Sequence, residues 1–188
     1  TQSRSSAASD VYKRQISMSA SRAHVAVDLG KSRCRAVISG PWGANDLRPQ
    51  RRPVYDGIGA PGLAAADGVA AALAAILPLR ERLDEPISDV SVGAAGAWAA
   101  PEAASELAHG LARAMRVPVS VTSDVVSAHA GALSGGAGVL LIAGTGAAAL
   151  GIDGEVATLV DGWGPELGDF GSGSSVSYTH LRAHETRG

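Results

Sequence analysis

The first part of the chain alternates short apolar runs with polar turns. Residues 24–29 (HVAVDL) and 34–39 (CRAVIS) are rich in apolar and β-branched side chains, and residues 30–33 (GKSR) between them include a glycine. This pattern predicts two strands joined by a turn. Residues 51–57 (RRPVYDG) predict a third strand, which Pro53 weakens because proline has no N–H to donate. The chain therefore opens as an antiparallel meander.

Helical and extended patterns alternate after this meander. Residues 61–77 place Leu and Ile at the spacing of one helix face and end before Pro78, and residues 101–116 predict a helix opened by Pro101. Further strands are expected at 87–96 and 117–124, a short helix at 124–135, and a pair of strands at 138–152. This order predicts an α/β fold, a mixed sheet with helices on its faces.

Composition and cysteine content narrow the class of protein. The chain has 188 residues, of which 46% are hydrophobic, as expected for one globular unit. No apolar run approaches the roughly 20 residues of a membrane span, and no hydrophobic secretion signal opens the chain. We therefore expect a cytoplasmic protein with no membrane partner. The single cysteine, Cys34, excludes an intramolecular disulfide and a cysteine-only metal site.

Both ends of the chain look foreign to this fold. Residues 5–15 (SSAASDVYKRQ) and 176–188 (VSYTHLRAHETRG) are similar to translated cloning adapters, so about residues 1–15 and 174–188 are set aside. We expect a protease to remove them because they belong to no core. They carry five basic and two acidic side chains, and without them the formal charge moves from −2 to −5. That balance argues against a nucleic-acid partner.

Five short motifs remain within residues 16–173, the expected domain. They are VDLGKSRCR (27–35), SVGAAGAW (91–98), TSDVVSAHAGAL (122–133), IAGTGAAALG (142–151) and DGWGPELGDFGSG (161–173). In this order they resemble the sugar kinase, Hsp70 and actin superfamily, and within it the N-acetylglucosamine kinase and BadF/BadG/BcrA/BcrD ATPase-type family. The resemblance covers about residues 22–173. It implies the N-terminal, ribonuclease H-like (actin-like) ATPase domain with a mixed five-stranded sheet, cut before a second domain.

The resemblance implies a nucleotide side with ATP and Mg²⁺ as cofactors. Asp28 would hold hydrated Mg²⁺, since carboxylate oxygens suit that ion. The phosphate contacts would come from two glycine-bearing turns, Gly30, Lys31 and Ser32 in the first and Gly144, Thr145 and Gly146 in the second. Backbone N–H groups of such turns can bind phosphate oxygens. The alternative for each turn is a hairpin whose glycines merely suit its backbone.

The resemblance also implies an acceptor side. Asp124 would be the general base that takes the proton of a sugar hydroxyl, and its alternative role is a helix N-cap. The implied sugar contacts are Gly96, Gly164, Gly168 and Asp169. Two residues depart from the family pattern: Phe170 stands where a glutamate is common, and Ala60 where an asparagine often contacts sugar. Among the aromatic residues, Trp98 and Trp163 are interpreted first as core or loop anchors rather than sugar-stacking platforms, and Trp163 is close enough to the glycine-rich loop to be either.

These residues indicate an enzyme, an ATP-dependent kinase of an amino sugar such as N-acetylglucosamine. Its partner would be the small-molecule sugar. The sequence leaves open whether the protein forms a homodimer. One alternative is a BadF-type ATPase activator of a 2-hydroxyacyl-CoA dehydratase, which needs cysteines for an iron–sulfur cluster; the single cysteine speaks against it. Another is a sugar-sensing regulator with a helix-turn-helix segment. Because only one domain is expected, the 188-residue chain should itself be inactive.

Overall fold

A computed structural model describes residues 22–40, 51–143, 147–162 and 172–173. The chain divides into two compact units, one ending at Asp124 and the other beginning at Val125, and each is described by itself. The adapter-like segments 1–15 and 174–188 lie outside the described residues. Among the described helices, none has the length and apolar character to cross a membrane.

The first unit is built on a mixed sheet of five strands in the order β3-β2-β1-β4-β5. The strands are β1 (Ala23–Leu29), β2 (Arg33–Ser39), β3 (Arg51–Ile58), β4 (Ile87–Ala94) and β5 (Val119–Ser123). The meander β1, β2 and β3 is antiparallel, whereas β4 and β5 run parallel to β1. The predicted mixed five-stranded sheet is confirmed. Pro53 lies in β3 at the sheet edge, where proline is tolerated.

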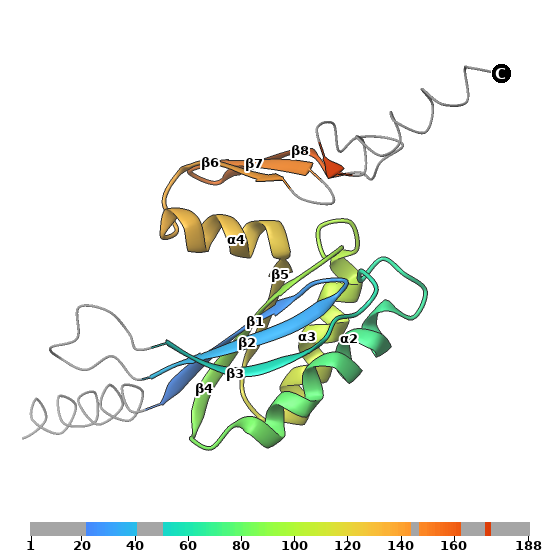
Figure 1. The fold of residues 1–188 in the computed structure, drawn as a ribbon, viewed down its shortest axis with the longest axis vertical. Coiled ribbons are helices and arrows are strands. Elements are labelled where there is room, and N and C mark those ends of the chain that lie inside the picture. Colours follow the sequence, from blue (N-terminus) through green and yellow to red (C-terminus); the bar gives the residue numbers. More distant parts are fainter. Residues whose placement is uncertain (1–21, 41–50, 144–146, 163–171, 174–188) are drawn as a thin grey trace, which may run out of the picture. The chain divides into compact units, whose positions relative to one another are not determined.

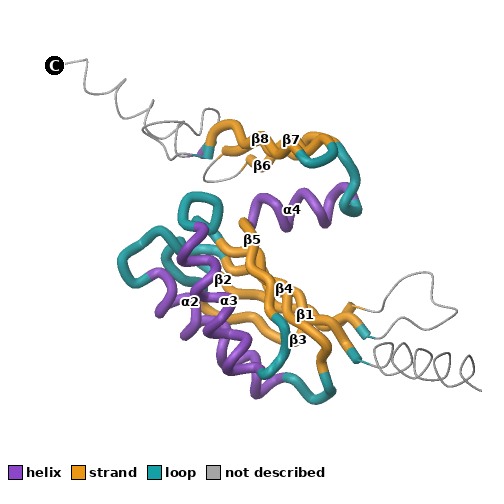
Figure 2. The backbone as a smooth tube through the Cα atoms, turned by 180° about the vertical axis from the view of Figure 1, so that it is seen from behind, coloured by secondary structure: helices purple, strands orange, loops and turns teal. Residues whose placement is uncertain are grey.

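Two helices cover one face of this sheet. Figures 1 and 2 show α2 (Gly68–Ile76) and α3 (Pro101–Met115) side by side against it. The side chains of β1 alternate between buried and exposed, and its buried row packs into one hydrophobic core with Ile76, Leu107 and Leu111 of the helices. Pro101 is at the first turn of α3, as predicted from its missing N–H.

The helix predicted over residues 61–77 differs from the one observed. Residues 61–67 form turns, because the N–H of Leu63 donates a hydrogen bond to the carbonyl oxygen of Ala95 (2.9 Å) and not to a helical neighbour. At the other end, Pro78 does not stop the chain from coiling, since a 3₁₀ helix, η1 (Leu77–Arg82), follows directly. Proline fits there because the first turn of a helix needs no N–H from it.

The second unit combines a helix with an antiparallel sheet of three strands. The helix is α4 (Asp124–Leu133), which begins at the last residue of the first unit, and the strands are β6 (Gly138–Ala143), β7 (Ala147–Asp153) and β8 (Val156–Asp161). His129 of α4 is buried, and its Nε2–H donates to the carbonyl oxygen of Gly138 (3.0 Å). This bond ties the helix to the start of β6. The sequence pattern had predicted β6 and β7 but not β8.

The single cysteine is a core residue. Cys34 is fully buried in β2, and burial raises the pKa of its thiol to about 11. The thiol is therefore protonated at neutral pH, and a protonated thiol is neither a nucleophile nor a metal ligand. The chemistry of this unit must come from other side chains.

Candidate active site at the carboxyl edge of the five-stranded sheet

Three parallel strands of the first unit end at the same edge of the sheet. Leu29 of β1 is in register with Ala94 of β4, which is in register with Ser123 of β5. Asp28 precedes the first of these residues, and Asp124 follows the last. Because neighbouring strands lie about 4.8 Å apart, the backbones of β1 and β5 are about 10 Å apart at this edge. The sheet therefore brings together two carboxylates that are far apart in the sequence.

Asp28 lies on the face of the sheet opposite the helices. It alternates with buried Val27 and Leu29, and its side chain is more than half exposed. Its Oδ2 accepts a hydrogen bond from the guanidinium of Arg35, its register partner on β2 (3.2 Å). An exposed pair of this kind contributes less than about 1 kcal/mol to folding. Asp28 is therefore held near a cation while staying accessible to solvent.

The turn after Asp28 is closed by the backbone and exposed at its tip. The N–H of Gly30 donates to the carbonyl oxygen of Arg33 (2.9 Å), and Lys31 and Ser32 are exposed. A Cβ added to Gly30 would meet only this Arg33 oxygen among the described atoms, at an ordinary 3.5 Å. The described neighbours therefore do not require glycine here, which leaves room for a ligand to approach the backbone.

Two further loops hold this turn in place. The N–H of Ala60 donates to the carbonyl oxygen of Gly30 (3.1 Å), and the N–H of Ala95 donates to that of Leu29 (3.0 Å). Gly59 packs so closely that an added Cβ would collide with the carbonyl oxygen of Gly30. The loops after β1, β3 and β4 thus form one backbone-bonded assembly at the carboxyl edge.

We expect Gly59→Ala to lower the free energy of unfolding by about 1–3 kcal/mol, the usual cost of forcing an extra methyl into packed surroundings. The colliding atoms are backbone, which cannot rotate away. The measurement is denaturant unfolding of the purified chain. Gly40→Ala is the matched control, because an added Cβ there meets no atom of the described residues within 4 Å. An unchanged midpoint for Gly59→Ala would show that the loops are not held by this contact.

The structure places the other predicted site residues as follows. Asp124 is the first residue of α4, and its Oδ1 accepts a hydrogen bond from the Ser123 hydroxyl (3.1 Å). Gly96, at φ +80°, has a packing reason of its own, since a Cβ there would lie 2.9 Å from the nitrogen of Leu63. Outside the described residues lie Gly144, Thr145, Gly146, Gly164, Gly168, Asp169, Phe170 and Trp163.

Sequence reasoning missed or misjudged several features of this edge. Ala60 was singled out only as a departure from a family pattern, yet it is buried and bonded to the Gly30 turn. The pair of Arg35 with Asp28 follows from strand register, which a motif does not reveal. Trp98, interpreted as a core or loop anchor, is 41% exposed and belongs to neither the core nor the residues packed against it, so the core half of that interpretation is wrong.

A second polar cluster lies at the opposite edge of the sheet. His24 Nδ1 is 2.7 Å from Asp89 Oδ2, and the Ser88 hydroxyl donates to the same carboxylate oxygen (2.8 Å). The Ser88 hydroxyl also approaches Nδ1 of His24 (3.1 Å). A Ser-His-Asp relay needs the serine and the aspartate on different ring nitrogens, so this cluster is not a nucleophilic triad.

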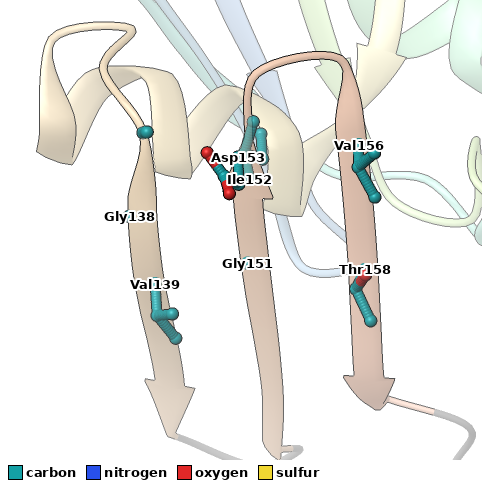
Figure 3. A pocket seen from close by; sticks show the side chains of 8 residues that line it. Gly138, Val139, Gly151, Ile152, Asp153, Val156 and Thr158 are labelled. Carbon is teal, nitrogen blue, oxygen red and sulfur yellow. The ribbon is translucent and has the colours of Figure 1, made fainter.

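A hollow of about 470 Å³ lies on the sheet of the second unit. Figure 3 shows Val139 on β6 and Val156 and Thr158 on β8, with Gly151 of β7 on the strand between them. Among the described residues that line it, Asp153 is the single ionisable one. A lining with no cation is poorly suited to phosphate, so the carboxyl edge of the first unit is the better candidate site.

Comparisons with known proteins support the fold assignment. No protein-family model and no curated protein matches the chain in sequence. A solved structure of a proposed N-acetylglucosamine kinase from Chromobacterium violaceum matches with a TM-score of 0.60 and 20% identity, over 86% of this chain and 56% of its own. One from Porphyromonas gingivalis, also a proposed N-acetylglucosamine kinase, matches with a TM-score of 0.58 and 20% identity, over 85% and 55%.

The chain therefore spans little more than half the length of these two structures. At this identity the likeness shows a shared fold. The predicted actin-like ATPase fold, of the ribonuclease H-like type, is confirmed.

Proposed function

We propose that the chain carries part of the active site of an ATP-dependent amino-sugar kinase, which transfers the γ-phosphoryl group to a hydroxyl of an N-acetylglucosamine-like sugar. The observation that carries the proposal is the position of Asp28 and Asp124 at one carboxyl edge of the sheet. The fold shared with two proposed N-acetylglucosamine kinases supports it.

On the nucleotide side, this proposal gives Asp28 the role of holding Mg²⁺ through water. The fit rests on the donor, a carboxylate more than half exposed at a strand end, and on the space above Gly30. The ion would neutralise phosphate charge in the transition state. The N–H groups of the Gly30–Ser32 turn would bind phosphate oxygens, with the charge of Lys31 close by. Thr145 and its neighbouring glycines are proposed to do the same in the second unit.

On the acceptor side, Asp124 is the proposed general base. Its carboxylate would accept the proton of the sugar hydroxyl as that oxygen attacks the γ-phosphorus. The hydrogen bond from the Ser123 hydroxyl engages Oδ1 and so orients the carboxylate. Strand β4 lies between β1, which carries Asp28, and β5, which leads into Asp124. The two carboxylates are therefore separate groups, and the proposal gives the metal-binding role to Asp28 and the role of general base to Asp124.

The test is ADP release by the full-length polypeptide that carries this sequence, with Mg·ATP and a panel of sugars. We expect release to depend on an amino sugar, with N-acetylglucosamine and close analogues preferred over glucose. Release at the same rate without any sugar would contradict a kinase and favour an ATPase. Tight sugar binding without ADP release would favour a regulator.

Replacing Arg35 tests the metal role of Asp28. We expect Arg35→Gln to lower the Mg²⁺ concentration needed for half-maximal ATP binding by up to about fivefold, since the carboxylate loses a competing cation worth less than about 1 kcal/mol. Arg33→Gln is the matched control, because Arg33 lies on the same strand and binds Asp56 instead (3.2 and 2.7 Å). Equal effects of the two changes, or a higher Mg²⁺ requirement for Arg35→Gln alone, would contradict this role.

A further inference from the structure

Trp98 is an exposed indole in the first unit, where Ile58 is the other large apolar side chain exposed among the described residues. It is 41% exposed, although tryptophan carries a large apolar surface that is normally covered. Tyr55, by contrast, packs against the core, and its hydroxyl donates to the carbonyl oxygen of Ala75 (3.1 Å). Trp98 is outside that core, so packing within the first unit does not explain it.

The loop that carries Trp98 is fixed by its backbone. Ala95 donates to Leu29 at one end and accepts from Leu63, and the N–H of Ala97 donates to the carbonyl oxygen of Ala94 (3.2 Å). Gly96 takes a left-handed φ of +80° and packs against Leu63. An aromatic side chain on a fixed loop binds a ligand at low entropic cost, since little further ordering is needed.

This loop leaves the sheet between the two candidate carboxylates. It follows β4, which lies between β1 with Asp28 and β5, the strand that leads into Asp124. Trp98 is four residues after Ala94, so its Cα lies within about 14 Å of the sheet edge, the greatest span of four extended residues. The indole is thus attached beside the place where phosphoryl transfer is proposed.

Of the two proposed substrates, ATP and the amino sugar, the chemistry of an indole favours the sugar. The face of an aromatic ring is electronegative and disfavours phosphate, whereas it suits the apolar C–H face of a sugar ring. Carboxylates and backbone groups can bind the hydroxyls around the rim of the same sugar. We propose that Trp98 is a specificity-determining residue that stacks on the acceptor amino sugar. This inference rests on the proposed kinase function and assigns a contact within it.

The test measures KM for the sugar and for ATP separately in the full-length polypeptide. Trp98→Ala should raise KM for the amino sugar by about tenfold, with KM for ATP unchanged, as expected for one lost stacking contact. Trp98→Phe keeps an aromatic face and should stay within about threefold of the original enzyme. Ile58→Ala is the matched control. Ile58 is 85% exposed at the end of β3, at the same edge of the sheet, but β2 and β1 separate it from the loop after β4. Its replacement should alter neither the KM for the sugar nor the KM for ATP.

The outcomes separate this inference from the function on which it rests. If the full-length polypeptide without substitutions shows no sugar-dependent turnover, the proposed function itself is overturned. An active original enzyme, with a sugar KM unchanged in Trp98→Ala, overturns the stacking role and leaves the kinase standing. A rise in KM for ATP alone would assign the indole to adenine and overturn the proposal. Equal losses in Trp98→Ala and Trp98→Phe, together with a lowered melting temperature, would show a structural role and overturn it too.

Discussion

Asp124→Asn should lower kcat for sugar phosphorylation by about 10²–10⁴-fold, the usual contribution of a general base. The amide cannot accept the proton of the attacking hydroxyl at neutral pH. Asparagine is nearly isosteric and suits a helix start as well as aspartate does, so α4 should still begin at this position. Affinity for Mg·ATP should change little, because Asp124 is assigned to the acceptor side. Steady-state kinetics and calorimetric titration of ATP measure the two effects.

Ser123→Ala is the control for this variant. It removes the hydroxyl that donates to Asp124 Oδ1 and keeps the carboxylate, so kcat should fall by less than about tenfold, the worth of one hydrogen bond. Near-normal kcat in Asp124→Asn would reduce Asp124 to a residue that only starts a helix. A fall in Ser123→Ala as large as that in Asp124→Asn would place the loss in local structure.

Asp28→Asn should weaken binding of Mg·ATP by at least about tenfold and leave sugar affinity within about twofold, since one charged ligand contact is worth more than about 1.4 kcal/mol. The variant also removes the partner of Arg35, but that pair is exposed and adds little to folding. Titration of each ligand by calorimetry decides the assignment.

Asp56→Asn serves as the matched control for Asp28→Asn. Asp56 lies on β3, which β2 separates from β1, and it pairs with Arg33. It shares the ion-pair chemistry and the register level of Asp28, but it lies two strands farther from the strand that leads into Asp124. Its change should leave both affinities unchanged. Equal loss of nucleotide and sugar binding in Asp28→Asn, or loss of sugar binding alone, would reverse the assignment of Asp28 to the nucleotide side.

Local patterns predicted the first unit well because its strands and helices follow simple periodicities. Every second side chain is buried along β1 and again along β2, and Pro101 marks a helix start that needs no partner elsewhere. The helix that begins at Gly68 was predicted to start too early, because Leu63 bonds to the loop after β4. A hydrogen bond between Leu63 and Ala95 depends on the folded sheet, and no local pattern contains it.

The candidate site was likewise predictable from the sequence only in part. Asp28 and Asp124 were singled out because they lie in motifs that resemble those of a known family, since each residue by itself also suits a turn or a helix start. Their common edge, the pairing of Asp28 with Arg35 and the glycine requirement at Gly59 come from strand order and register. The exposure of Trp98 likewise depends on what packs around its loop. The second phosphate turn, with Thr145, stays a prediction.

The most direct test of the proposed function is the identity of the phosphorylated product. The full-length polypeptide is supplied with Mg·ATP labelled in the γ-phosphoryl group and with N-acetylglucosamine, and the label is traced by chromatography and mass spectrometry. We predict label in a sugar monophosphate, formed with ADP in equal amounts and lost in Asp124→Asn. Label found only in inorganic phosphate, with the amino sugar unchanged, would contradict an amino-sugar kinase.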